Sequence, residues 1–344
     1  MSERPVDAIL FVSFGGPEGP DDVLPFLHNV LRGRNVSPER LREAARHYER
    51  FDGVSPINGQ NRALIAALEA ELVARGPALP VYWGNRNWRP LLEDTLRRMA
   101  GDGVRRALAF VTSAFSSYSG CRQYREDLER ARAAVGAQAP DVEKLRAFHN
   151  HPGFIEANAD RVRTALAAWP CAHRVSVPIA FTAHSIPLAM AAGCAYQAQL
   201  QEACALLAER IGGNPWALAF QSRSGAPGQP WLEPDIGEHL KRLHESGVRE
   251  VVVSPLGFLS DHMEVVYDLD TEAAAIAQGL GMTMRRAAAA GSHPAIVAMI
   301  RELVLERVAG AEPRALGSRG PLPDVCPADC CLPGTAPARP GPRA

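Results

Sequence analysis

Short apolar segments alternate with long amphipathic stretches along most of this chain. Runs rich in Val, Ile, Leu and Phe occupy residues 8–14, 79–84, 106–112, 174–182, 216–221 and 250–256. Between them lie stretches of helical period, including 196–211 and 234–246. This order is typical of strand–helix–strand units, which form parallel sheets with helices on both faces. We therefore predict an α/β protein with doubly wound sheets.

The length of 344 residues corresponds to two domains at roughly 150 residues each. A Trp-Pro-Cys-Ala-His segment at 169–173 interrupts a helical pattern that runs over 154–168. We place one domain at 1–168 and a second at 169–310. The last 34 residues, 311–344, hold eight of the 28 prolines, so this tail is not expected to form a regular packed element.

Charge and apolar content limit the partners of the chain. Lys and Arg number 37 against 38 Asp and Glu, so no excess of positive charge attracts nucleic acid. No run of 18 apolar residues is long enough to span a membrane, and the N-terminus lacks the pattern of a signal peptide. We expect a cytoplasmic protein with at most peripheral membrane contact. Seven sparsely placed cysteines argue against a disulfide framework.

Two strand ends carry polar residues where ligands of open α/β sheets collect. His184 follows an apolar strand within Thr-Ala-His-Ser-Ile-Pro at 182–187. An imidazole at this position accepts a proton near neutral pH or binds a metal, although a histidine that only caps the next helix has the same sequence signature. Gly15 and Gly16 follow the first strand and let the backbone approach a ligand closely, or form only a turn.

Three acidic residues recur at intervals of four in the stretch that begins at Asp261. If this stretch is an α-helix, Glu264, Asp268 and Glu272 share one face and span about 12 Å. No Lys or Arg lies between them in the sequence to offset their repulsion. The row therefore requires a cation, raised pKa values or full solvation. Because it follows an apolar strand, we favour oxygen ligands for a divalent metal in transit.

Several motifs together resemble the ferrochelatases over residues 6–310. They are Ser-Phe-Gly-Gly-Pro-Glu at 13–18, Gly-Val-Ser-Pro-Ile at 53–57, Tyr-Trp-Gly-Asn-Arg at 82–86, Thr-Ala-His-Ser-Ile-Pro at 182–187, Gln-Ser-Arg-Ser-Gly at 221–225 with Pro-Trp-Leu at 230–232, and Ser-Asp-His-Met-Glu at 260–264. The resemblance implies two Rossmann-like domains that face a porphyrin cleft and an enzyme that inserts Fe²⁺ into a porphyrin. The chain looks most similar to actinobacterial enzymes that act on coproporphyrin III.

The resemblance also implies roles for particular residues. His184 and Glu264 match the catalytic pair of the family, and Asp268 and Glu272 match an acidic row that joins them in handling the metal. Residues implied to contact the porphyrin are Arg32 with Arg34, Ser55, Tyr118 and Trp231, with Phe14 and Phe115 as further wall candidates. Glu18 stands where some relatives have a tyrosine that reaches the metal.

The cysteines of the tail resemble those of ferrochelatases that carry a [2Fe–2S] cluster. Cys326, Cys330 and Cys331 supply three thiolates, and the fourth is implied to be Cys121, with Cys171 as the rival. Zinc and free thiols remain alternatives for the same residues.

Other functions stay open at this stage. They are insertion of iron into protoporphyrin IX, insertion of cobalt or nickel into a related tetrapyrrole, a tetrapyrrole carrier without turnover, and iron–sulfur electron transfer. The expected partners are the porphyrin, Fe²⁺ and a downstream enzyme of haem biosynthesis.

Overall fold

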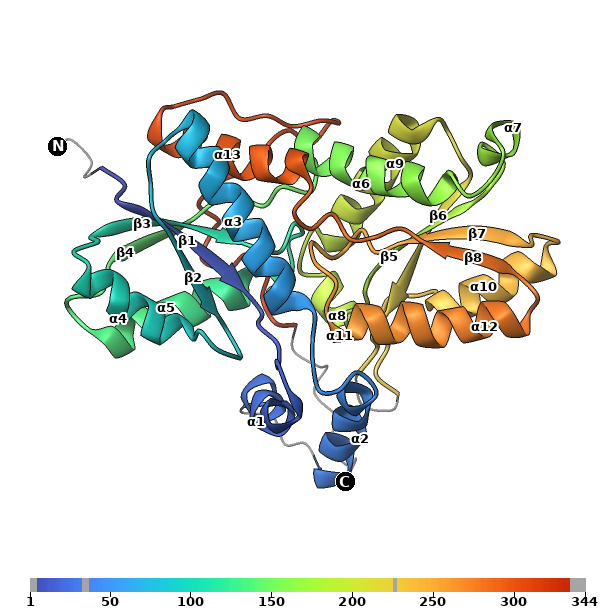
Figure 1. Cartoon of the computed structure of the whole chain (residues 1–344), viewed down its shortest axis with the longest axis horizontal. Coiled ribbons are helices and arrows are strands. Elements are labelled where there is room, and N and C mark those ends of the chain that lie inside the picture. Colours follow the sequence, from blue (N-terminus) through green and yellow to red (C-terminus); the bar gives the residue numbers. More distant parts are fainter. Residues whose placement is uncertain (1–4, 33–36, 225–227, 335–344) are drawn as a thin grey trace, which may run out of the picture.

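The computed structural model describes residues 5–32, 37–224 and 228–334. These residues form two α/β halves that lie side by side (Figure 1). The strands are β1 Ala8–Ser13, β2 Val81–Asn85, β3 Arg106–Val111, β4 Asp141–Lys144, β5 Ile179–His184, β6 Trp216–Gln221, β7 Glu250–Ser254 and β8 Thr283–Arg286. The helices are α1 Pro20–Val30, α2 Pro38–Glu49, α3 Ile57–Arg75, α4 Leu92–Gly101, η1 Tyr118–Arg122, α5 Gln123–Val135, α6 Pro152–Leu166, α7 Cys171–Arg174, α8 Leu188–Ala191, α9 Tyr196–Ile211, α10 Ile236–Glu245, α11 Met263–Val265, η2 Val266–Ala273, α12 Ala274–Gly279 and α13 Pro294–Val308.

Each half contains a four-stranded sheet in which every pair of neighbours is parallel. The orders are β2-β1-β3-β4 and β6-β5-β7-β8, so the two halves repeat one topology. In both sheets the chain reverses its direction of winding between the first strand of the half and the third. Ligands of doubly wound sheets bind beyond the carboxyl ends of the strands at such a point. The topology therefore predicts that ligands bind beyond the carboxyl ends of β1 and β3 in one half and of β5 and β7 in the other.

The two faces of each sheet belong to different apolar layers. Ile179, Phe181 and Ala183 of β5 point into a large core that also contains α3, α6, α9 and α13. Ala180 points to the opposite layer, which is made with α10, α11, η2 and α12. Because side chains alternate along a strand, His184 at the end of β5 faces the same layer as Ala180. The sheet thus directs His184 toward the acid-bearing helix.

The predicted α/β class with two parallel sheets is confirmed, and the errors are local. The structure adds β4 and β8, which are four-residue edge strands too short to show a periodic pattern. The strand predicted over 174–182 begins only at Ile179, because Cys171–Arg174 form a short helix. Asn214 also holds the preceding loop by donating to the carbonyls of Arg174 and Val177.

Two helices cross between the halves. The sequence assigns α6 to the first domain, yet α6 packs against α9, β7 and β8 of the second half. Helix α13 contacts both α6 and α3, so it returns to the first half (Figure 1). Within the described residues, no helix is long and apolar enough to cross a membrane.

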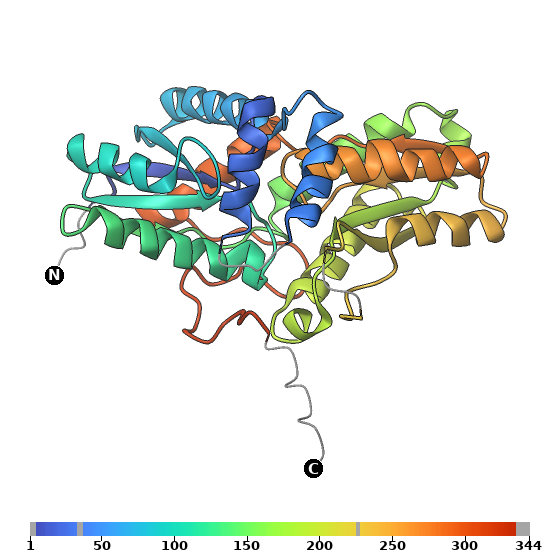
Figure 2. The ribbon, with the colours of Figure 1, turned by 90° about the horizontal axis from the view of Figure 1, so that it is seen from below.

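The tail beyond α13 has no helix or strand up to residue 334, as its composition predicts. It nevertheless packs onto the buried connector that follows β4. Arg146 donates to the carbonyl oxygen of Arg314 and forms a two-pronged ion pair with Glu306, and the Asn150 amide donates to the carbonyls of Leu316 and Gly320. Figure 2 shows the tail running beneath the junction of the halves. Polar contacts from the connector replace a hydrophobic core in holding the tail.

Candidate active site

His184 lies at the carboxyl end of β5, in register with Gln221 at the end of β6. Its backbone carbonyl accepts a hydrogen bond from the Tyr196 hydroxyl at 2.9 Å. Nδ1 lies 2.5 Å from the Ser185 carbonyl oxygen. A ring nitrogen that faces a carbonyl carries the proton, so the neutral imidazole presents a lone pair at Nε2. Helix α8 begins after Pro187 with no side-chain cap hydrogen bond, so His184 is not the cap of the next helix.

Glu264 faces this nitrogen from the loop and helix that follow β7. Its Oε2 lies 3.6 Å from His184 Nε2. The His184 side chain is 34% exposed and that of Glu264 53%, so both are accessible. His262 begins α11, since its Nδ1 accepts the Glu264 backbone N–H at 3.2 Å. Burial lowers the pKa of His262, which favours its neutral form. The structure thus brings the predicted histidine and glutamate together.

The acidic row departs from an ordinary α-helix. Residues Val266–Ala273 form a π-helix, η2, between the short α11 and α12. The helix that the spacing of the acids assumes is present, and its wider π-turn is a feature that periodicity does not reveal. Asp268 and Glu272 lie in η2, and Glu264 lies in α11 just before it. π-helical turns are rare and occur frequently at functional sites.

Asp268 is the most perturbed acid of the row. Burial raises its pKa to about 7, and the negative charges of Glu264 and Glu272 act in the same direction. The Ser222 hydroxyl donates to Asp268, and Gln221 Nε2 donates at 3.3 Å. These residues follow β6 and belong to a motif noted in the sequence. A carboxyl group with such a pKa exchanges protons readily near neutrality.

Helix α2 of the first half covers the acidic helix. His47 stacks on Tyr267 with ring centroids 3.9 Å apart, and the Arg50 guanidinium lies 5.6 Å from the same ring. Burial and the charge of Glu264 raise the pKa of Tyr48. The sequence did not single out His47, Tyr48 or Tyr267, since these contacts join segments more than 200 residues apart.

The residues predicted to contact the porphyrin differ in their exposure and in their hydrogen-bond partners. Arg32 is exposed and donates to Asn29 Oδ1 at 2.7 Å, whereas Ser55 is only 4% exposed and packs against Gly16. Tyr118 is half-buried in η1 and donates to Glu126 at 3.1 Å. Trp231 is 8% exposed, and its Nε1 has no hydrogen-bond partner within the described part of the chain.

Phe115 is not a wall residue. It is 2% exposed and packs edge-on against Phe154 and Tyr196 in the large core. Glu18 forms an ion pair with Arg62. Arg34 and Gly225 lie outside the described residues.

Four cysteines line one cavity of about 250 Å³. They are Cys121, Cys326, Cys330 and Cys331. Cys330 and Cys331 have their sulfurs 3.4 Å apart, and the Cys121 thiol acts as a hydrogen-bond partner that lowers the pKa of Cys326. Cys171 is exposed at the start of α7 and does not line this cavity. Arg122 donates to the carbonyls of Ala328 and Cys330, which holds the tail in place.

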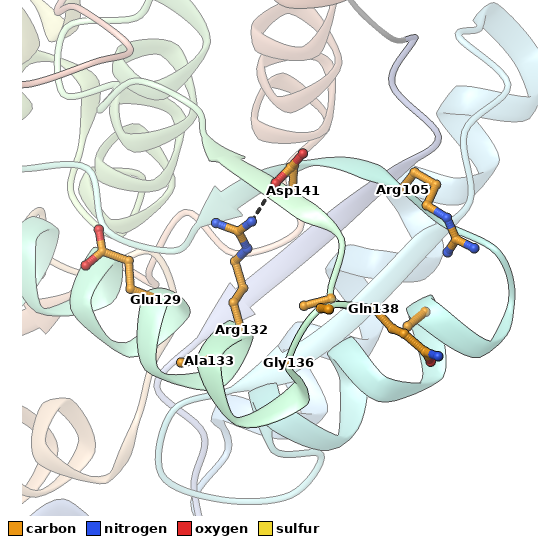
Figure 3. A pocket seen from close by; sticks show the side chains of 10 residues that line it. Arg105, Glu129, Arg132, Ala133, Gly136, Gln138 and Asp141 are labelled. Atoms are coloured by element: carbon orange, nitrogen blue, oxygen red, sulfur yellow. Dashed lines mark hydrogen bonds and ion pairs between the residues drawn. The ribbon is translucent and has the colours of Figure 1, made fainter.

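A larger surface pocket of about 690 Å³ lies elsewhere, beside the loop that precedes β4. Figure 3 shows Arg132 reaching across it to Asp141. This pocket opens near the starts of β3 and β4, whereas ligands of such sheets bind at the carboxyl ends. Across the described ranges, no group of three or more His, Cys, Asp or Glu side chains is gathered closely enough to hold a metal ion.

Solved structures place the fold among the chelatases. SirB from Bacillus subtilis has a TM-score of 0.53 at 12% identity, with 88% of this chain and 96% of that chain covered. A second match is a multi-domain protein from Deinococcus radiodurans with structural similarity to chelatases. Its TM-score is 0.53 at 18% identity, and the match covers 90% of this chain and 56% of that protein's chain. The chain thus shares its fold of two parallel sheets with these proteins.

Sequence comparison is more specific. The sequence model of the ferrochelatase family matches residues 6–308. A ferrochelatase from Rhodopirellula baltica is 56% identical, covering 96% of this chain and 95% of the relative. A coproporphyrin III ferrochelatase from Streptomyces coelicolor is 53% identical, covering 98% and 96%. This chain belongs to the ferrochelatase family.

Proposed function

We propose that this protein inserts Fe²⁺ into coproporphyrin III, with His184 and Glu264 as its catalytic residues. The observation that carries the proposal is the 3.6 Å separation of His184 Nε2 and Glu264 Oε2 at the carboxyl end of β5. Relatives named coproporphyrin III ferrochelatase, at 50 to 54% identity over more than nine-tenths of the chain, support this porphyrin as the substrate.

Insertion exchanges two protons for one dication. The free porphyrin loses two pyrrole N–H protons, and Fe²⁺ loses its bound water as it enters between the four nitrogens. His184 Nε2 accepts a porphyrin proton, and Glu264 stabilises the imidazolium that forms. Asp268 and Glu272 offer oxygen ligands that Fe²⁺ exchanges easily on its way to the porphyrin. Asp268 also accepts protons that leave His184, because its pKa is about 7.

The porphyrin requires apolar walls and groups that bind its propionates. We propose that Trp231 and Tyr118 contact the ring and that Arg32 binds a propionate, with Ser55 supporting the same loop region. An exposed Arg can hold a carboxylate through two parallel hydrogen bonds, which supports the assignment of Arg32. The unpartnered Nε1 of Trp231 supports a ligand on that side of the indole.

Anaerobic turnover with coproporphyrin III and protoporphyrin IX in parallel tests the function. We expect repeated turnover with Fe²⁺ and faster turnover with coproporphyrin III. Binding without repeated release of the iron porphyrin would indicate a carrier, and faster insertion of Co²⁺ or Ni²⁺ in competition would indicate a different chelatase.

A pair of histidine variants tests the catalytic assignment. His184→Ala should abolish insertion while porphyrin binding, followed by fluorescence quenching, is retained. His244→Ala is the matched control, since His244 lies near the end of α10, shortly before β7 begins, whereas His184 lies at the opposite, carboxyl end of the sheet. Normal turnover of His184→Ala would refute the assignment.

We further propose that Cys121, Cys326, Cys330 and Cys331 hold a [2Fe–2S] cluster. Four thiolates are the donor set that such a cluster requires, and these four side chains line one cavity with Lys144 and Arg122 beside them. Positive groups there offset the negative charge of a thiolate-bound cluster. When bound, the cluster supplies one-electron redox chemistry and a cross-link between the tail and the first domain. No step of insertion is assigned to it.

Cysteine variants separate this cluster from the alternatives. Cys330→Ser should remove the visible absorbance of the purified protein together with its non-substrate iron and sulfide. Cys171→Ser is the matched control and should leave them unchanged, because Cys171 is exposed and lies outside the cavity. Zinc in place of iron and sulfide, or no metal at all, would refute the cluster.

We propose a cytoplasmic setting, with the iron porphyrin passing to a later enzyme of haem biosynthesis. The seven cysteines form no disulfide in the described part of the chain, and a reducing compartment maintains cysteines in that state. Fractionation of the native cells, with immunodetection of the protein, tests this localisation.

A further inference from the structure

The segment that carries the acidic row contains five carboxylates, and a single arginine divides them into two groups. Arg286 at the end of β8 pairs with Asp261 through Nη1 at 2.8 Å and with Asp270 through Nε at 2.5 Å. For the other three, Glu264, Asp268 and Glu272, the described residues contain no Lys or Arg ion pair. Arg286 thus pairs with the two acids outside the row, and no Lys or Arg among the described residues pairs with an acid within it.

The two acids that pair with Arg286 flank part of the row and so hold it in position. Asp261 precedes α11, and Asp270 lies within η2, so Glu264 and Asp268 lie between the two attachment points. The side chains of Asp261 and Arg286 are only 13% and 19% exposed. The Arg286–Asp261 pair is therefore screened less than a surface pair and holds a defined geometry, whereas the Asp270 side chain is 37% exposed. A π-helix is an unfavourable, rarely extended conformation, so attachment along its length limits alternative α-helical windings.

A residue of the first half attaches the same unit across the domain junction. Gln60 in α3 accepts the Asp261 backbone N–H at 2.9 Å, and its Nε2 lies 3.4 Å from Asp261 Oδ2. These two residues are 201 positions apart in the sequence. The contact therefore relates the position of the acidic row to the first half, from which α2 also covers η2.

We propose that Arg286 and Gln60 are positioning residues for metal delivery. Arg286 holds Asp261 and Asp270 so that Glu264 stays opposite His184 and the carboxylates of the row keep no Lys or Arg partner among the described residues. Gln60 fixes this unit relative to the first half. The inference rests on the proposed function of the row as the path of Fe²⁺. Neither residue touches the metal or the porphyrin in this role.

Steady-state kinetics with the full-length protein tests Arg286. We expect Arg286→Gln to raise the KM for Fe²⁺ about tenfold while the KM for the porphyrin changes less than twofold. Arg286→Lys should recover part of the loss, because an ammonium pairs with one of the two carboxylates at a time. Arg285→Gln is the matched control, since Arg285 is the exposed neighbour on β8 and should leave both constants unchanged.

Two outcomes would overturn the inference. One is an Arg286→Gln protein whose KM for Fe²⁺ is unchanged and whose kcat falls only in proportion to its folded fraction, measured by circular dichroism. If that variant does not fold, Gln60→Ala is tested in its place. The second outcome that would overturn the inference is an unchanged KM for Fe²⁺ in Gln60→Ala. We expect Gln60→Ala to raise this KM about threefold. An inactive wild-type protein would instead refute the proposed function, which separates the two failures.

Discussion

Replacing Asp268 by Asn should stabilise the protein at alkaline pH. Asp268 is held in a buried setting beside two other acids, which raises its pKa from 3.8 to about 7. The folded state therefore binds the proton more tightly than the unfolded state, so wild-type stability falls as the pH rises from about 4 to about 7. Asn carries no charge, while its carbonyl oxygen can still accept from Ser222.

The magnitude follows from the pKa difference of about 3. Each pKa unit corresponds to about 1.4 kcal/mol, so ionised Asp268 costs the folded state at most about 4 kcal/mol above pH 8. The advantage of Asp268→Asn should grow by about 2 kcal/mol between pH 5.5 and pH 8, because the unfolded carboxyl is already ionised at the lower value. Insertion activity should fall in the same variant, since the row loses a ligand.

Urea denaturation at about pH 5.5 and pH 8, followed by intrinsic fluorescence, measures this difference. The matched control is Asp270→Asn, which removes a partner of Arg286 and should lower stability at pH 8. A stability difference between wild type and Asp268→Asn that is the same at both pH values would refute the reasoning, because it would mean that burial does not raise this pKa.

Three further substitutions test other parts of the structure. Arg146→Met leaves buried Glu306 without its partner and should lower the free energy of unfolding by about 3 kcal/mol, measured by urea denaturation. Tyr196→Phe removes the hydrogen bond to the His184 carbonyl and should reduce insertion several-fold at a stability cost of about 1 kcal/mol, measured by turnover and thermal melting. Gly257→Ala should lower turnover strongly, because a Cβ there would lie 2.6 Å from Ala183 Cα and displace the end of β5; unchanged turnover would contradict this.

Much of the candidate active site could be predicted from the sequence because it depends on local pattern. An apolar strand followed by Thr-Ala-His identified His184, and the spacing of four identified the acids beyond β7. The α/β class followed from strand and helix periods in the same way. The alternation of side chains along β5 then accounts for the direction in which His184 points.

Contacts between distant segments could not be predicted in this way. The π-helical winding of Val266–Ala273, the cover provided by His47 and Tyr48, and the Gln60–Asp261 contact all depend on how the halves pack. The preference for Cys121 over Cys171 came from the resemblance, and the structure adds that Cys121 lines one cavity with the tail cysteines.

By itself, the sequence determined which residue types are present and indicated most of the longer strands and helices, because propensity and periodicity act over a few residues. Only the tertiary structure decided which acids remain without a cationic partner. Arg286 reaches Asp261 and Asp270 rather than the row, since β8 lies at the edge of the second sheet beside them. Ion pairing depends on separations of a few ångströms, and chain folding sets these separations between residues that are far apart in sequence.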